Sequence, residues 1–203
     1  MATHSSVLQR CFEEAATSSA RGLQRSIDEA IADLQAEEST AAKVALRDRL
    51  ALAWNSLLKQ RPSLPQAYSE GLRAAFSAAV AGAPVEVAPN PSRFAALTSG
   101  GSGFGGLTLV DDDQIMQTIE FTRLSQQLRL QVDEQIADLD ALVCAALGLP
   151  RVQPEMNPLR PEVFAGALRD LLSQAPVESE TRARWLKALA APLGRELNAI
   201  YES

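Results

Sequence analysis

The sequence has few aromatic residues, one histidine, two cysteines and no long apolar run. Aromatic residues make up 5% of its 203 residues. Its apolar content is mostly alanine and leucine, which suits the packing of helix on helix better than strands. No apolar run approaches the roughly 18–20 residues that a membrane-spanning helix requires, and the N-terminus lacks the basic and apolar regions of a secretory signal. We therefore expect an all-α protein of the cytoplasm that does not insert into a membrane.

Positive charge is also scarce, since 19 basic residues face 25 acidic residues and the formal net charge is −6. A nucleic-acid partner requires a basic face that neutralises phosphates, so we expect none. Anionic membrane surfaces are disfavoured for the same reason. His4 lies near the N-terminal end, and Cys11 and Cys144 each have apolar neighbours. We therefore expect two reduced cysteines, no metal site and no cofactor.

Apolar residues recur at three- and four-residue spacing along the first eighty residues, which is typical of amphipathic helices. This spacing predicts three helices, over roughly residues 5–37, between Thr40 and Pro62, and over about 65–81. Ser39 or Thr40 is placed to cap the second helix with its side-chain oxygen. Gly22 and the small polar residues before it are expected to weaken the first helix, so we predict a kink or break there.

A longer helix is predicted over roughly residues 112–147, as the central helix and spine of a helical bundle. Its apolar stripe is close to coiled-coil spacing, so we consider homo-oligomers through this helix. Two further helices are expected from about residue 161 and from about residue 178. Because the last helical pattern stops without a cap, we expect the chain to be a fragment of a longer protein.

Residues 83–106 are rich in proline, glycine and serine and predict a flexible linker or loop. The expected organisation is an N-terminal helical segment (1–82), this linker, and a C-terminal helical segment (107–203). Glycines 101, 103 and 106 match the spacing G-x-G-x-x-G. A dinucleotide-binding fingerprint needs a strand before the glycines and a helix directly after them. Prolines and serines precede these glycines and the extended LTLV follows, so we interpret them as linker residues.

Three aspartates, at positions 111–113, follow the linker. Carboxylates there would accept backbone N–H bonds at a helix start and meet the positive end of the helix dipole. Magnesium binding and docking of a partner are the alternatives. Elsewhere the sequence has no G-x-S-x-G motif, and its paired carboxylates lie on charged helix faces. We therefore expect no catalytic residues and no enzyme.

Two blocks of sequence, LTLVDDDQI and NPLRPEVF, carry a family resemblance. The matching residues are Leu107, Leu109, Val110, Asp111 and Asp112 in the first block and Asn157, Pro158, Leu159 and Pro161 in the second. Arg160 stands where a glycine is common. The chain resembles an uncharacterised proteobacterial family, domain of unknown function 1631, chiefly over residues 107–203. The resemblance implies a long, mostly helical cytoplasmic protein and supplies no catalytic residues.

Two hypotheses for function follow. The preferred one is a non-enzymatic helical interaction module, a scaffold or regulatory adaptor that binds a protein partner. Its candidate partner-binding residues are Phe104, Leu107, Leu109, Asp111, Asp112 and Asp113. The alternative is a ligand-sensing domain for a nucleotide second messenger such as a cyclic dinucleotide. Its candidate anion-binding residues, near the start of a predicted helix, are Arg151, Arg160 and Arg169.

Overall fold

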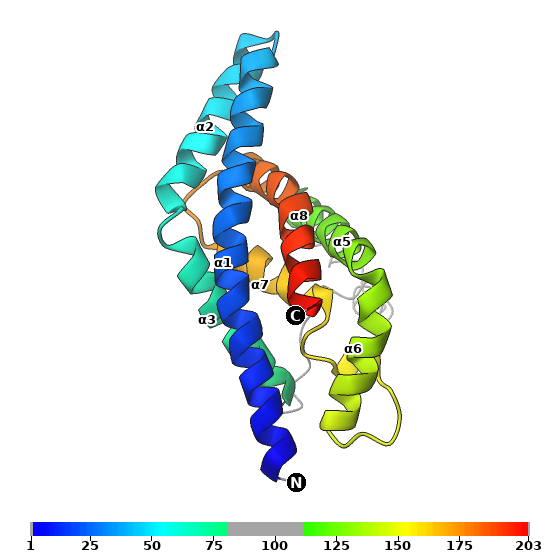
Figure 1. Cartoon of the computed structure of the whole chain (residues 1–203). Coiled ribbons are helices and arrows are strands. Elements are labelled where there is room, and N and C mark those ends of the chain that lie inside the picture. Colours follow the sequence, from blue (N-terminus) through cyan, green and yellow to red (C-terminus); the bar gives the residue numbers. More distant parts are fainter. Residues whose placement is uncertain (1, 81–111, 203) are drawn as a thin grey trace, which may run out of the picture.

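The computed structural model of the chain describes residues 2–80 and 112–202, and all regular structure in these ranges is helical (Figure 1). The helices are α1 (Ala2–Thr40), α2 (Val44–Gln60), α3 (Leu64–Val80), α5 (Asp112–Gln131), α6 (Asp133–Ala146), the short 3-10 helix η1 (Pro154–Met156), α7 (Pro161–Ser173) and α8 (Ser179–Tyr201). The predicted all-α helical bundle is confirmed. The linker predicted over 83–106 lies outside the described residues. None of the described helices is both long enough and apolar enough to cross a membrane.

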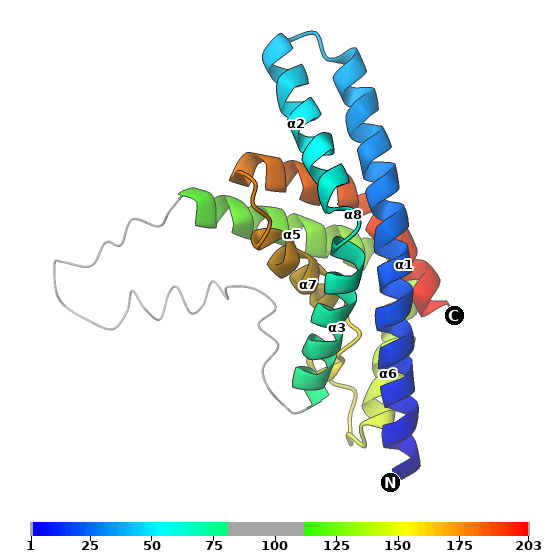
Figure 2. The same cartoon turned by 90° about the vertical axis from the view of Figure 1, so that its left-hand side faces the viewer.

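Helix α1 is the spine of the bundle, and α2, α3 and α8 pack along it (Figures 1 and 2). The break predicted near Gly22 is wrong, because α1 continues through 39 residues. Gly22 is buried, and a Cβ at this position would lie 3.0 Å from the Cβ of Glu196 on α8. Ser19 and Ser26 are buried beside it. These small residues let α8 approach closely, and this packing outweighs the roughly 1 kcal/mol that glycine costs inside a helix.

Ser39 and Thr40 close α1 and do not cap the following helix, which corrects the prediction. The hydroxyl of Ser39 donates to the carbonyl of Ala36 at 2.7 Å, and the Thr40 hydroxyl donates to the same carbonyl at 3.2 Å. Helix α2 begins only after Lys43, whose backbone is extended and whose side chain makes no cap hydrogen bond. The α1–α2 hairpin therefore turns later than expected, and it projects beyond the other helices at one end of the molecule (Figure 2).

The single helix predicted over 112–147 is also wrong, because α5 and α6 are separate and α1 is the longest helix. The break falls at Val132, where φ is −121° and ψ is 16°. Val132 is fully buried, and Asp133 and Glu134 form the first turn of α6. Carboxylates in a first turn favour a helix start because they meet the positive end of the helix dipole. The burial of Val132 and the two acidic residues that follow it explain why α6 begins as a separate helix at this point.

Residues before 81 and after 111 contribute to one hydrophobic core. Its largest fully buried side chains include Trp185, Tyr68, Phe76 and Phe164. Two of them also link helices by hydrogen bonds to main-chain carbonyls. The Trp185 indole donates to the carbonyl of Ala53 on α2 at 2.8 Å, and the Tyr68 hydroxyl donates to Phe164 on α7 at 3.1 Å. Burial raises the pKa of Tyr68 far above its usual value, so its phenol stays a donor.

Candidate functional site

Most of the predicted partner-binding residues are not described by the structure. Phe104, Leu107, Leu109 and Asp111 lie outside the described residues. Asp112 opens α5, and Asp113 follows it within the first turn, in agreement with a helix start near this position. The side chains of both are outside the described part of the chain. The docking role assigned to all six residues, including Leu107 and Asp113, stays a prediction.

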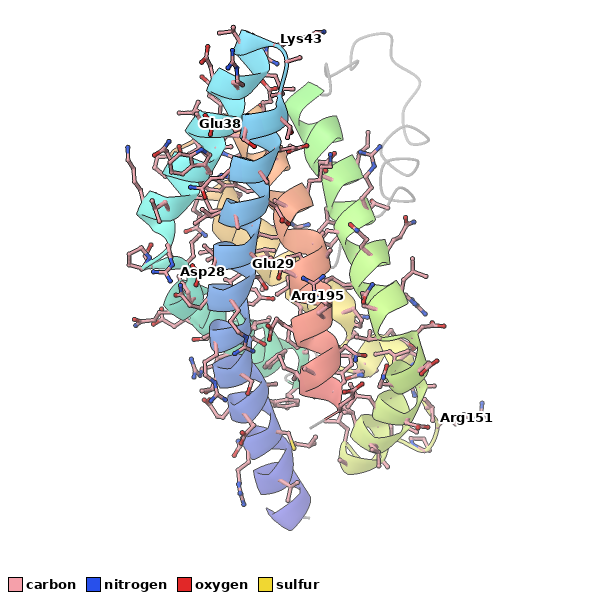
Figure 3. The ribbon with its side chains drawn as sticks, turned by 45° about the horizontal axis from the view of Figure 1, so that its top comes forward. Asp28, Glu29, Glu38, Lys43, Arg151 and Arg195 are labelled. Carbon is pink, nitrogen blue, oxygen red and sulfur yellow. The ribbon has the colours of Figure 1, made fainter. Side chains whose placement is uncertain are left out.

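The three candidate anion-binding arginines have different surroundings. Arg160 precedes α7 with an extended backbone, and its Nε is buried without a hydrogen-bond partner. Arg169 lies within α7, where its guanidinium is 4.6 Å from the ring centroid of Phe121 and pairs with Asp170. Arg151 is exposed and points away from the helices (Figure 3). Arg169 is thus already engaged, and the phosphate-binding hypothesis rests on Arg160.

The second resemblance block forms a buried polar connection between α6, η1 and α7. The side-chain amide of Asn157 donates to the carboxylate of Asp140 at 2.7 Å, and its oxygen accepts from the N–H of Leu159 at 2.8 Å. The Tyr201 hydroxyl on α8 donates to the carbonyl of Leu159. Sequence reasoning missed Asp140, although an aspartate between Leu139 and Val143 on the apolar side of the helix was a usable signal. This block holds the turn before α7 in place.

The enclosed space between α1, α7 and α8 is too small for a ligand. It has a volume of about 10 Å³ and is lined by Ser19, Phe164, Leu193, Glu196, Leu197 and Ile200. A cavity needs roughly 10–15 Å³ to hold one water molecule. The Ser19 hydroxyl at this space is buried without a hydrogen-bond partner among the described residues.

The outward side of α2 combines exposed apolar side chains with positive charge. Val44, Leu52 and Leu58 are 62%, 53% and 46% exposed, although Leu50 and Leu57 on the inward side are fully buried. The stretch from residue 43 to residue 61 contains five basic residues and one acidic residue, in a chain of net negative charge. Six exposed residues at the start and along the outward half of α2 form what we name the basic face: Lys43, Val44, Arg47, Leu52, Leu58 and Lys59. The single acid of the stretch, Asp48, is exposed among them.

Within residues 2–80 and 112–202, the cations of the basic face differ from the other basic residues of this stretch in having no ion-pair partner. Arg49 of the same helix pairs with Glu180 at 3.0 Å, and Arg61 pairs with Asp28. Among the described residues, by contrast, the basic groups at 43, 47 and 59 form no ion pair. Lys43 stands at the turn of the projecting hairpin (Figure 3). Sequence reasoning missed this face because it weighed the charge of the whole chain and not the local excess on one helix.

The outward side of α6 has the opposite charge. No basic residue occurs between Arg129 and Arg151, and the exposed Glu134 and Asp138 lie beside Leu142, which is 69% exposed. The described part of the chain offers neither carboxylate an ion-pair partner. We name this surface the acidic face: Glu134, Ala137, Asp138, Ala141, Leu142 and Ala145. It was missed because the region was interpreted as one coiled-coil helix.

Comparison with known proteins gives one match. The model of the family described as "Protein of unknown function (DUF1631) N-terminal domain" matches residues 3–203, and so extends well before residues 107–203, which chiefly carried the resemblance. No curated protein and no solved structure matches the chain. Because the match covers almost every residue, the chain belongs to the DUF1631 family and corresponds to its N-terminal domain.

Proposed function

We propose that the chain is a non-enzymatic helical interaction module, a scaffold or regulatory adaptor of the cytoplasm, and that the basic face of α2 binds its protein partner. The observation that carries this proposal is the concentration of three exposed apolar side chains and three cations, none of them in an ion pair with a described residue, at the start and around the outward half of α2. Single exposed leucines are normal on protein surfaces. Their grouping beside unpaired charge is typical of a surface that a partner covers.

The inward side of α2 supports the proposal, because it fixes the helix before any partner arrives. Leu50, Ala53 and Leu57 are fully buried, and the Trp185 indole is hydrogen-bonded to the carbonyl of Ala53. Towards the end of α1, the indole of Trp54 donates to the carboxylate of Glu38 at 2.6 Å. A preorganised helix loses little conformational freedom on binding, so more of the gross interaction energy remains as affinity.

The chemistry of the basic face indicates the kind of partner. Apolar side chains of a partner helix would cover Val44, Leu52 and Leu58, and burial yields about 25 cal/mol per Å² of apolar surface. Carboxylates on the same partner would pair with Arg47 and Lys59. We therefore expect an acidic amphipathic helix as the bound element.

Two designed helical peptides test this proposal. They share one leucine stripe, and their polar residues are all glutamate in one and all lysine in the other. Fluorescence anisotropy with the labelled peptides should show saturable binding of the glutamate peptide only, and added salt should weaken it. Leu52→Asp should abolish this binding. Val152→Asp, at a residue that is 54% exposed outside the basic face, is the matched control. Equal binding of both peptides, or equal loss in both variants, would contradict the proposal.

Ligand sensing is kept as a second candidate because of one observation, the unpartnered Nε of Arg160 beside the first turn of α7. A thermal-shift screen with cyclic dinucleotides tests it. A ligand at a hundred times its dissociation constant stabilises a protein by about 2.7 kcal/mol. A melting temperature that does not change with any of these ligands would exclude tight sensing.

A further inference from the structure

We propose that the acidic face of α6 in a second copy of the chain binds the basic face of α2, so that copies assemble head to tail. This inference rests on the proposed function, because it names the partner of the basic face. It starts from complementary charge. Lys43 and Arg47 are four residues apart at the start of α2, and Glu134 and Asp138 are four residues apart at the start of α6.

The spacing of these charges allows two ion pairs to form together. Four residues of helix span about 6 Å along the axis. Because both pairs of charges have this spacing, Lys43 and Arg47 can each meet one carboxylate of the partner without a change in either helix. Neither pair of charges forms an ion pair with the part of its own copy that the structure describes.

The apolar residues of the two faces also fit each other. Ala137, Ala141 and Ala145 recur every four residues on the exposed side of α6 and form a row with little side-chain bulk. Rows at this spacing accept the ridges of a neighbouring helix at short interaxial distance. Val44 and Leu58, which lie within about 60° of Arg47 around α2, supply such side chains. Helix α6 is otherwise lightly packed, since it contacts α1, α8 and η1 mainly on its other side.

The position of the two faces decides the type of assembly. Helix α2 lies beside one end of α1, and α6 lies towards the opposite end (Figures 1 and 2). The two faces of one copy are therefore held apart, and each can meet the face of a different copy. A contact between two different faces is heterologous, so each added copy brings a further unused face. The assembly therefore grows as an open chain or closes into a ring.

The size of the contact predicts a weak association. A contact between one helix and one helix buries much less surface than the standard protein interface, which buries about 1,600 Å². We therefore expect self-association at high micromolar protein that declines as salt screens the ion pairs. Analytical ultracentrifugation of the 203-residue chain, across a range of concentrations at low salt, should show a weight-average mass that rises above that of the monomer.

Two charge-reversed variants give the decisive experiment. One carries Lys43→Glu and Arg47→Glu, and the other carries Glu134→Lys and Asp138→Lys. Each variant alone presents like charges on both faces and should stay monomeric. A mixture should associate as the wild type does, because each reversed face then meets an opposite charge in the other variant. Because a lysine in the first turn of α6 is unfavourable, circular dichroism must first show that each variant keeps the helix content of the wild type at the temperature of the experiment.

A third charge-reversed variant controls for the change of net charge. Asp33→Lys with Glu37→Lys makes the same change of charge, at the same spacing, on exposed residues of α1. This control should leave association intact. A wild type that stays monomeric, or folded variants whose mixture stays monomeric, would overturn the inference. If the glutamate peptide still binds the monomer through Leu52 in that case, the proposed function stands and the inference alone fails.

Discussion

Helix α1 and the α5–α6 pair are of similar length but differ in how they are supported. Helix α1 runs unbroken for 39 residues, with α2, α3 and α8 packed along it. The α5–α6 pair bends at Val132, and beyond the bend α6 has few neighbours. Packing on several sides holds α1 together across Gly22, whereas α6 depends on a few buried groups. Tertiary support, more than local helix propensity, decides where a helix of this bundle continues.

The largest expected effect is loss of the fold when a charged residue replaces a buried apolar residue of α5. Leu128→Asp places a carboxylate at a fully buried position, at a cost of several kcal/mol against a total stability of about 5–15 kcal/mol. Circular dichroism should show an unfolded chain. Leu130→Asp, two residues away and 75% exposed, is the control and should keep the melting temperature of the wild type. An unchanged melting temperature for Leu128→Asp would place this residue outside the core.

A smaller but substantial loss is expected where α1 meets α8. Gly22→Leu adds a side chain where even a Cβ lies 3.0 Å from Glu196. Overpacking of this kind costs about 1–3 kcal/mol, which chemical denaturation can measure. Gly71→Ala on α3, where a Cβ meets nothing within 4 Å, should instead stabilise by about 0.5–1 kcal/mol. Equal effects of the two substitutions would mean that α8 does not require a small residue at position 22.

The buried amide–carboxylate contact is the third test and concerns α6. Asp140→Ala leaves the Asn157 side chain buried without its acceptor, at a cost of about 1–3 kcal/mol. Because α6 has few other contacts, hydrogen exchange should accelerate in α6 more than in α1. Asp138→Ala, at an exposed position of the same helix beyond its first turn, should change neither rate. Uniform acceleration over both helices would show that α6 unfolds only with the whole domain.

The smallest effect is expected at the surface ion pairs of α1. A hydrogen bond and charge interaction from Arg61 lower the pKa of Asp28. Because the folded-state pKa is depressed, this stabilisation is present above the usual carboxyl pKa and disappears as the pH falls through the lowered value. Both side chains are more than 40% exposed, so solvent screening keeps the contribution small. Asp28→Asn should lower stability slightly at neutral pH, and the difference should disappear in acid. A difference that persists in strong acid would contradict this.

The sequence predicted the helical class and most core positions, because apolar spacing reports directly which side of a helix is buried. Leu23, Ile27, Leu50 and Leu128 are buried as their periodicity indicates. The sequence did not predict the continuity of α1. Glycine weakens an isolated helix, and only the contact with Glu196 shows that Gly22 serves the packing of α1 against α8. The break at Val132 was missed because coiled-coil spacing continues through it. The two charged faces depend on which sides of α2 and α6 stay uncovered, and this is a property of the tertiary structure.

The two tryptophans give the molecule a built-in optical reporter. Trp185 is fully buried and donates its hydrogen bond inside the core, so its emission should lie at short wavelength and follow global unfolding. Trp54 is partly exposed on α2, one helical turn before Leu58, and is hydrogen-bonded to Glu38. A partner that covers the basic face would exclude water from the surroundings of Trp54 and would not change those of Trp185. Its red-side emission would then shift to the blue while the Trp185 signal stays fixed, so occupancy of α2 could be followed without any label.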